Sequence, residues 1–254
     1  MSGPGSLGEA TVFVLFGLVF GSLATALSHR LPLGLPIGND RSRCPKCAVS
    51  LGVADLVPLL SWGAARGRCR HCGQPISWRY PVIELLVALL FLAAWRHCVG
   101  DLPGAVILAL TAFGLTVITV ADLEAGIIPD AMLLFLAPLA VIWRWWDGGG
   151  WWDGLAGAVA GVVVTYGLRW GFKRWRGRDG LGLGDVKFLG VAGYYLGLQD
   201  LGAYLLLSGL TGLLLGVVWR LSGRGPVFPF GPALCVSLLV GLFHPAVLAV
   251  LAPG

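Results

Sequence analysis

Long apolar stretches constrain this chain more than any other feature of its sequence. A helix that crosses a bilayer needs about 20 mainly apolar residues. Stretches near that length lie at 9–27, 81–97, 104–121, 131–146, 154–170, 201–219 and 233–251, and a shorter one runs from 186 to 198. We therefore expect an all-α polytopic membrane protein with about eight transmembrane helices. A single bent span over 186–219 would reduce the number to seven.

The overall composition agrees with a chain embedded in a membrane. Of the 254 residues, 57% are hydrophobic and 12% are charged. Soluble domains carry about 25% charged residues. A soluble globular domain is therefore excluded.

The positive charges are unevenly distributed, and their placement predicts the topology. Eight of the 18 lysines and arginines lie between positions 30 and 79, namely Arg30, Arg41, Arg43, Lys46, Arg66, Arg68, Arg70 and Arg79. Six more lie between positions 169 and 187, namely Arg169, Lys173, Arg174, Arg176, Arg178 and Lys187. Because basic loops stay in the cytoplasm, both loops are predicted to be cytoplasmic and the N-terminus external. The net charge of +5 then reflects topology, and no nucleic-acid partner is expected.

The segment 1–27 could be a signal peptide or a first transmembrane helix. "ATA" at 24–26 resembles a cleavage site, but the segment lacks a basic n-region and precedes a strongly basic loop. We therefore expect an uncleaved anchor. The predicted domains are a first transmembrane helix at 1–27, a cytoplasmic loop domain at 28–80 and a membrane core at 81–254.

Four cysteines in the loop 28–80 have the spacing of a metal site. "CPKC" at 44–47 and "CRHC" at 69–72 form C-x2-C-x21-C-x2-C, which can surround one Zn²⁺ with Cys44, Cys47, Cys69 and Cys72. Four thiolates leave no open position, which favours a structural zinc site. Two disulfides are the alternative, but the cytoplasm is reducing. Ala48 stands where zinc knuckles favour glycine, so slight strain is expected in the first knuckle.

Two aspartates stand beside apolar stretches, where a charge is costly unless it is used. Asp122 ends the stretch 104–121, and Asp185 follows "GLGLG" at 180–184. The predicted topology brings both to the cytoplasmic face. Neighbouring carboxylates there could share a proton, as in an aspartic protease. Each aspartate could instead be only a helix-end charge.

Several motifs along the chain together resemble one known family. They are "GSLATALSHRLP" at 21–32, "GRCRHCGQPISWRYPVIELL" at 67–86, "DLEAGIIPD" at 122–130, "GLGDVKFLGVAGYYLG" at 182–197 and "FPFGPAL" at 228–234. In this order they resemble the motifs of bacterial type IV prepilin leader peptidases/N-methyltransferases, which are GxGD membrane aspartyl proteases. The resemblance covers nearly the whole chain.

This resemblance implies an aspartyl endopeptidase of the bacterial inner membrane, surrounded by lipid, with its active site facing the cytoplasm. The family's catalytic pair falls on Asp122 and Asp185. Gly182 and Gly184 belong to the loop that lets an extended substrate backbone approach. The implied substrates are type IV prepilins or type II secretion pseudopilins, whose basic leader is cut after a glycine.

The four-cysteine loop resembles that of bifunctional members, which then methylate the new N-terminal amine with S-adenosylmethionine. The sequence has no Rossmann-type G-x-G-x-x-G pattern, so no residue is assigned to the methyl donor. Two alternatives stay open: a peptidase alone, and a membrane transporter or assembly scaffold with a zinc loop. A transporter needs a polar path through the bilayer, whereas the acids here gather at one face.

Overall fold

The computed structural model describes the chain over the ranges 6–38, 42–44, 46–177, 180–225 and 228–251. Over these ranges the secondary structure is helical, and the only β-type pairings are two isolated bridges, Arg43–Ser50 and Arg68–Pro75. The all-α prediction is confirmed for this part of the chain. Arg41 and Arg178, which were used above for topology, lie outside the described residues, as do 1–5 and 252–254.

The chain divides into two compact units, Met1–Phe113 and Gly114–Gly254. The first unit holds α1 (Leu7–Arg30), the 3-10 turn η1 (Val53–Asp55), α2 (Leu60–Ala64) and α3 (Arg79–His97). The helix α4 (Leu102–Ala125) crosses the boundary. The second unit continues with α5 (Asp130–Trp146), α6 (Trp151–Arg176), α7 (Leu183–Leu221), α8 (Gly231–Phe243) and α9 (Pro245–Leu251). The cysteine loop thus belongs to the first unit and both aspartates belong to the second.

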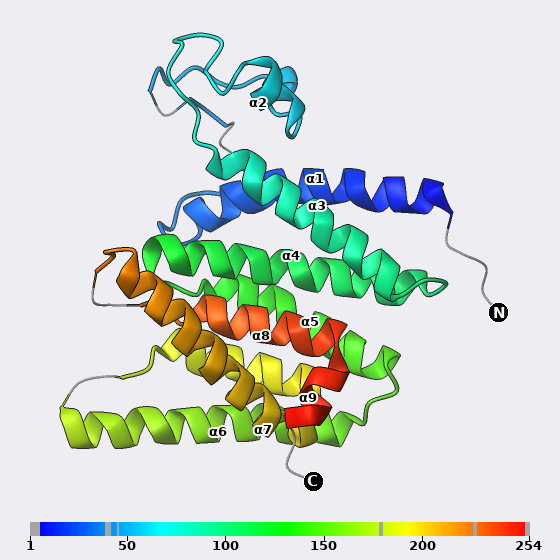
Figure 1. The fold of residues 1–254 in the computed structure, drawn as a ribbon, viewed down its shortest axis with the longest axis vertical. Helices are drawn as coiled ribbons and strands as arrows, with labels where there is room; N and C mark the ends of the chain where they lie inside the picture. The colour runs from blue at the N-terminus through cyan, green and yellow to red at the C-terminus, as the bar shows by residue number, and fades with distance from the viewer. Residues whose placement is uncertain (1–5, 39–41, 45, 178–179, 226–227, 252–254) are drawn as a thin grey trace. The chain divides into compact units, whose positions relative to one another are not determined.

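In the first unit α1 packs closely on α3, as Figure 1 shows. Small residues permit the approach. A Cβ atom on Gly17 would lie 2.6 Å from Ala88 Cα, and one on Gly21 would lie 2.5 Å from Glu84 Cα. Membrane helices associate through such small-residue contacts, because lipid provides no hydrophobic drive between them.

Polar contacts anchor the end of the cysteine loop to these two helices. The Glu84 carboxylate, buried on α3, accepts the backbone N–H of Leu59 at 2.8 Å. Arg79 donates to the Ser28 hydroxyl at 2.8 Å and to the Thr25 carbonyl at 3.3 Å. Polar groups inside an apolar bundle are costly unless they are paired, so these bonds hold the loop in place.

In the second unit α7 is the central helix, and it packs against α6, α8, α5 and α9. Its contact with α6 is made by glycines on both sides. A Cβ atom on Gly157 would overlap the Gly193 carbonyl oxygen and lie 2.7 Å from the carbonyl carbon of Gly197. A Cβ atom on Gly161 would overlap the Leu189 carbonyl oxygen. The two backbones therefore touch, which only glycine allows.

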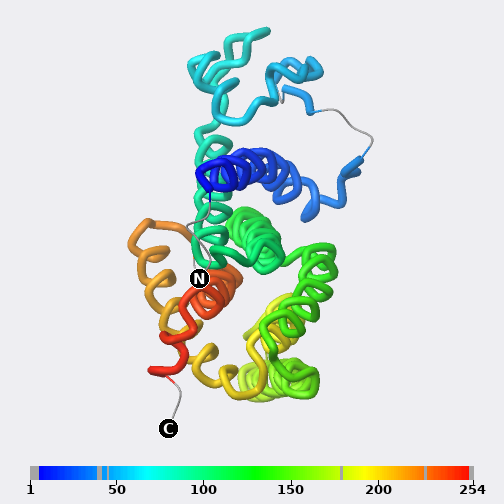
Figure 2. The backbone as a smooth tube through the Cα atoms, turned by 90° about the vertical axis from the view of Figure 1, so that its right-hand side faces the viewer, coloured from blue at the N-terminus to red at the C-terminus, as the bar shows by residue number. Residues whose placement is uncertain are grey.

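The helix α7 is broken at Gly197. Its 39 residues would extend about 58 Å as one straight helix, nearly twice the roughly 30 Å core of a bilayer. Gly197 has φ 81° and ψ 177°, a conformation that is essentially limited to glycine. The parts before and after this residue run in different directions in Figures 1 and 2, where they are coloured yellow and gold. We refer to them as the two arms of α7.

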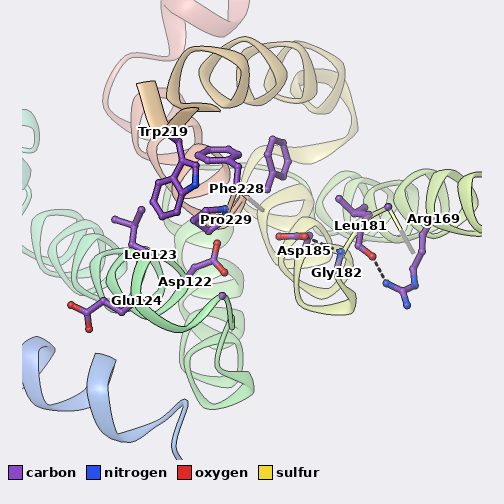
Figure 3. Close-up of a pocket in the computed structure, with 13 residues that line it drawn as sticks. Asp122, Leu123, Glu124, Arg169, Leu181, Gly182, Asp185, Trp219, Phe228 and Pro229 are labelled. Atoms are coloured by element: carbon purple, nitrogen blue, oxygen red, sulfur yellow. Dashed lines mark hydrogen bonds between the residues drawn. The ribbon is translucent and has the colours of Figure 1, made fainter. Parts of the chain in front are cut away.

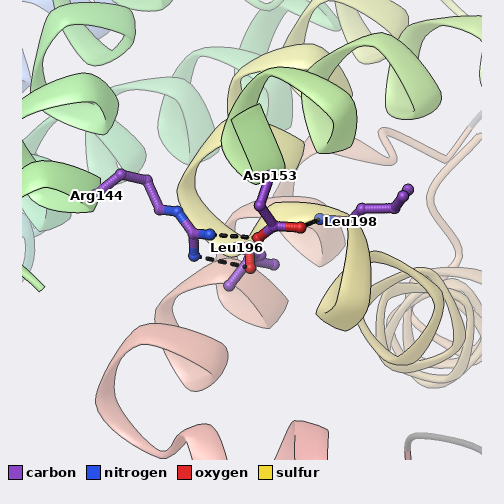
Figure 4. A network of polar contacts seen from close by, with 4 residues as sticks. All are labelled: Arg144, Asp153, Leu196 and Leu198. Carbon is purple, nitrogen blue, oxygen red and sulfur yellow. Dashed lines mark hydrogen bonds and ion pairs between the residues drawn. The ribbon is translucent and has the colours of Figure 1, made fainter. Parts of the chain in front are cut away.

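A polar network connects the residues on either side of this break, as Figure 4 shows. Arg144 donates to the carbonyl of Leu196 at 3.2 Å and forms an ion pair with Asp153. The other Asp153 oxygen accepts the N–H of Leu198 at 3.1 Å. The break leaves a carbonyl at the end of the first arm and an N–H at the start of the second without partners in the helix. The Arg144–Asp153 ion pair supplies hydrogen bonds to both groups.

Every apolar stretch that was expected to span the membrane consists mostly of helical residues. The stretches 186–198 and 201–219 are the two arms of α7. Within the described ranges, five helices are long and apolar enough to cross a membrane: α1, α3, α4, α6 and α7. The number is six if α8 and α9 form one broken span. The chain is therefore a multi-pass membrane protein, and eight passes stay a prediction.

One apolar stretch is not a continuous helix. The stretch 233–251 was treated as one segment, but α8 and α9 meet at an angle of 105°. The break lies at His244, directly before Pro245. Proline has no N–H to continue the helix and disfavours helical geometry in the residue before it. Hydropathy alone does not register this effect.

Candidate functional site

Asp122 lies near the end of α4 and is 6% exposed. Its Oδ2 atom accepts the backbone N–H of Gly231, the first residue of α8, at 2.8 Å in a buried bond. Two segments far apart in the sequence therefore meet at this carboxylate. A buried carboxylate requires such a donor, because it has lost its water.

Asp185 lies in the first turn of α7 and is half-buried. Its Oδ2 atom accepts the N–H of Gly182, the residue that caps this helix, at 3.1 Å. Gly184 sits where a Cβ atom would lie 3.0 Å from Ile128 Cβ. The two glycines thus let the chain pass close to both the carboxylate and the segment that follows α4.

The structure brings the two aspartates together. Both line a hollow of about 730 Å³ and a second hollow of about 270 Å³. In Figure 3 the two carboxylates point toward one another, and they interact electrostatically. Two carboxylates that line one hollow are harder to ionise together, because their negative charges repel each other.

The larger hollow has aromatic and charged walls. Trp219, Phe228 and Phe230 line it, and the rings of Trp219 and Phe228 meet edge-to-face at 6.1 Å. Glu124 and Arg169 add one charge of each sign. Arg169 donates to the carbonyl of Leu181, drawn as a dashed line in Figure 3, and so supports the glycine loop. Such a hollow can hold an extended peptide with apolar side chains.

The smaller hollow is bordered by an ion pair. Asp130 begins α5, and its two oxygens each lie 2.8 Å from the Lys187 amine. Asp130 lines the hollow together with Asp122 and Asp185. The Asp130–Lys187 ion pair is exposed and therefore contributes little to stability. Asp130 also lies in the first turn of α5, where a helix N-terminus favours a carboxylate.

The four predicted metal-binding cysteines also come together, in the first unit. The sulfurs of Cys44, Cys47, Cys69 and Cys72 all lie within 4.8 Å of one another, and those of Cys44 and Cys72 are 3.9 Å apart. A tetrahedral ion with Zn–S bonds of about 2.3 Å would place sulfurs about 3.8 Å apart. The cluster could therefore hold a four-coordinate metal ion.

Two equivalent hairpins present these cysteines. In the first, Cys44 N–H donates to Val49 and Ala48 N–H donates to Cys44. In the second, Cys69 N–H donates to Gln74 and Gly73 N–H donates to Cys69, with the same spacing. Ala48 has φ 56° and Gly73 has φ 68°. Because alanine is strained in this left-handed region, the strain expected in the first knuckle is confirmed.

The thiols of this cluster influence one another's ionisation. The backbone N–H groups of Cys47 and Lys46 lower the pKa of Cys44 to about 6. At Cys72 the N–H of Gln74 acts in the same direction, but desolvation and the neighbouring thiols outweigh it and raise the pKa to about 11. A cation held by the four sulfurs would favour the thiolate form of all four cysteines, because metal ligation requires thiolates.

Comparisons with known proteins agree with this arrangement. The family model described as bacterial Peptidase A24 N-terminal domain matches residues 15–98, and that of the type IV leader peptidase family matches residues 108–217. A protein of Dickeya chrysanthemi is 37% identical, with 90% of each chain covered. The chain belongs to the type IV leader peptidase family.

Other relatives of this peptidase family match over similar lengths. A protein of Aeromonas hydrophila is 35% identical over 90% of this chain and 88% of its own. One of Bacillus subtilis strain 168 is 33% identical over 94% of this chain and 96% of its own. All three relatives are named prepilin leader peptidase/N-methyltransferase. No solved structure shows a significant match. Membership in this family makes the chain a protease, and therefore an enzyme.

The cysteines fall within the first family match and both aspartates within the second. Two neighbours of the aspartates received no role from the sequence. Arg169 was counted only as a charge that sets topology, although it supports the glycine loop. Gly231 lies inside the recognised motif "FPFGPAL" and beyond the second match, and only the folded chain brings it to Asp122.

Proposed function

We propose that this peptidase is a membrane aspartyl endopeptidase that removes the basic leader of type IV prepilins or type II secretion pseudopilins. One observation carries the proposal. Asp122 and Asp185, from different helices, line the same two hollows and point toward one another. The names of the relatives supply the substrate class.

The chemistry follows from a proton shared by the pair. The ionised carboxylate takes a proton from a water molecule, whose oxygen attacks the scissile carbonyl carbon. The protonated carboxyl group donates to the carbonyl oxygen, and a tetrahedral intermediate forms. Its collapse breaks the C–N bond as the leaving nitrogen takes up a proton. Water is the nucleophile, so no covalent enzyme intermediate is formed.

Gly182 and Gly184 would admit the substrate. A loop without side chains at these positions lets an extended backbone approach Asp185. The cut would follow a glycine of the leader, which is the residue that fits most closely against such a loop. The aromatic wall of Trp219, Phe228 and Phe230 would face the first apolar residues after the cut.

The active site would face the cytoplasm in the inner membrane. The basic loops 28–80 and 169–187 would stay inside, with the segment 1–27 as an uncleaved helix and 81–254 as the membrane core. The two arms of α7 would each cross the membrane, which gives eight passes. The basic loops would repel a basic leader, and anionic lipid headgroups together with Glu124 would offset this repulsion.

The four cysteines would hold one structural Zn²⁺. Four thiolates close the coordination sphere, so the metal would organise the loop between α1 and α3 and take no part in cleavage. The loop has few apolar contacts of its own, and the metal would supply much of its folding free energy. Among the cysteines that the structure describes, Cys98 and Cys235 lie outside the cluster.

After cleavage, the chain would methylate the new N-terminal amine with S-adenosylmethionine as methyl donor. The support for this second activity is the N-methyltransferase part of the relatives' names. The free amine produced by cleavage is the nucleophile that such a transfer needs. A peptidase without this activity is the alternative.

A reconstitution experiment tests the proposal. The purified protein is placed in liposomes with a prepilin peptide that carries a basic leader, a glycine and an apolar helix, together with labelled S-adenosylmethionine. We expect cleavage after the glycine, identified by mass spectrometry, and label on the product's new N-terminus. A matched peptide with valine in place of that glycine should remain uncut. An intact parent peptide would contradict the peptidase, and an unlabelled product would contradict only the methylase.

A further inference from the structure

The segment that leads into α8 contributes a backbone group to the aspartate pair. Gly231 is the first residue of α8 and follows Phe230, which makes no side-chain capping bond. Its N–H donates to Asp122 Oδ2 at 2.8 Å, in a buried bond between residues 109 positions apart. This N–H has no carbonyl partner within its own helix, so it is available to the carboxylate.

A side chain at this position would displace the Asp122 carboxylate. A Cβ atom on residue 231 would lie 2.6 Å from Asp122 Oδ2 and 3.0 Å from Asp122 Cγ. Pro232 follows and has no N–H of its own. The start of α8 thus presents one donor to Asp122 and no side chain, and the positive end of the helix dipole favours a negative charge there.

The two aspartates differ in the donors that they receive. Asp122 accepts a buried bond of 2.8 Å, whereas Asp185 accepts an exposed bond of 3.1 Å from Gly182. A shorter bond away from water favours the ionised form of its acceptor more strongly. The donor at Asp122 therefore favours a negative charge on its acceptor more strongly than the donor at Asp185 does.

We propose that Gly231 is a positioning residue of this pair, whose N–H orients Asp122 and keeps it ionised as the general base. Asp185 then retains the shared proton and acts as the general acid. This inference rests on the proposed peptidase function, and it assigns the two roles that the sequence leaves open. The pair still titrates as a unit, so its two apparent pKa values belong to both residues.

Other ionisable groups surround the pair and must stay unchanged in a test. They are Lys187 and Tyr204 on α7, Arg169 on α6, Asp130 on α5, Glu124 on α4 and the buried thiol of Cys235 on α8. A substitution at Gly231 leaves all of them in place. A change in the pH profile then reports the lost N–H contact.

The test compares Gly231→Ala with Gly241→Ala on the same helix, where the new Cβ atom would meet the flexible Leu248 side chain at 2.8 Å. Prepilin peptide cleavage is measured against pH in liposomes. For Gly231→Ala we expect kcat to fall about 10–100-fold with KM nearly unchanged, because the general base is displaced. The acid limb of the profile should move up by about one pH unit, since the ionised form has lost a donor. Gly241→Ala should keep the wild-type kcat and acid limb.

A second measurement uses the wild-type protein alone and does not depend on the variants folding. Phe–Gly pairs occur at 16–17, 20–21, 113–114 and 230–231. Carbonyl-¹³C phenylalanine combined with ¹⁵N glycine therefore selects four amide signals. We expect only the chemical shift of the Gly231 amide to change with pH. The midpoint of this change should fall at the same pH as the midpoint of the acid limb of the activity profile.

The outcomes separate this inference from the function on which it rests. A wild-type enzyme that cuts no prepilin peptide overturns the proposed function. An active wild type with no Phe–Gly signal that titrates, or a folded Gly231→Ala variant with wild-type kcat and acid limb, overturns the role of Gly231 alone. A lowered kcat with an unmoved acid limb overturns the assignment of Asp122 as the base.

Discussion

The cysteine cluster and the aspartate pair are built by opposite means. Each half of the cluster is a hairpin closed by hydrogen bonds across a few residues, and nearby apolar side chains such as Val49 and Val53 are exposed. The pair joins α4 to α7, and α8 supplies a donor from 109 positions away. With zinc bound as proposed, the cluster would depend on a metal ion for stability, whereas the pair depends on helix packing. A change in one region should leave the other intact.

Loss of a cysteine should have the largest effect. Cys44→Ser is expected to reduce bound zinc from about one equivalent to almost none, because structural zinc contributes on the order of 10 kcal/mol to the folding of such loops. The residues 42–76 should then become sensitive to protease. Metal analysis and limited proteolysis measure both effects, and Cys98→Ser, outside the cluster, is the matched control. Purified wild-type protein that lacks metal and still resists cleavage in this loop would contradict the prediction.

A substitution at the glycine contact between α6 and α7 should come next. Gly157→Ala places a methyl group against the backbone of α7, and overpacking of this kind costs about 3 kcal/mol. We expect a lower unfolding temperature and weaker prepilin cleavage, with bound zinc unchanged. Gly167→Ala on the same helix meets open space and should be neutral or slightly stabilising. Equal behaviour of the two variants would show that the contact is not required.

Loss of the polar network at the break of α7 should have a smaller effect. Asp153→Asn removes the ionic partner of Arg144 and weakens the bond to Leu198, at a cost of about 1–3 kcal/mol. Thermal unfolding in detergent measures this, and Asp147→Asn, an exposed change just before α6, is the control. If both variants unfold at the wild-type temperature, the network does not stabilise the break.

Substitutions at Ala48 and Gly73, in the two cysteine hairpins, should have the smallest effects. They should change the stability of the loop in opposite directions. Ala48→Gly relieves a left-handed alanine, and Gly73→Ala introduces one where a Cβ atom meets nothing within 4 Å. Each change should alter loop stability by about 1 kcal/mol, the first raising and the second lowering it. Competition with a zinc chelator compares the variants, and cleavage of prepilin peptide should not change. A shift of the same sign in both variants would refute the backbone explanation.

How much the sequence could predict differs between these regions for a physical reason. Apolar stretches mark the helices, and cysteine spacing marks the metal cluster, because both signals are local. The resemblance located Asp122 and Asp185, but not the donor that each one receives. The break at Gly197 and the contact of Gly231 depend on helices that meet only after folding. Pro245 is a local signal for the bend after α8, but the prediction for 233–251 used hydropathy alone.

The central claim is that Asp122 and Asp185 act as one catalytic pair. The most direct test measures prepilin peptide cleavage by wild type, Asp122→Asn and Asp185→Asn in liposomes, with folding checked by thermal unfolding and bound zinc. Asparagine keeps the shape of the side chain and removes the acid. We expect both variants to fold, to keep their zinc and to lose at least about a thousandfold in cleavage rate. A folded variant that still cuts at a rate near that of wild type would show that its aspartate is only a helix-end charge.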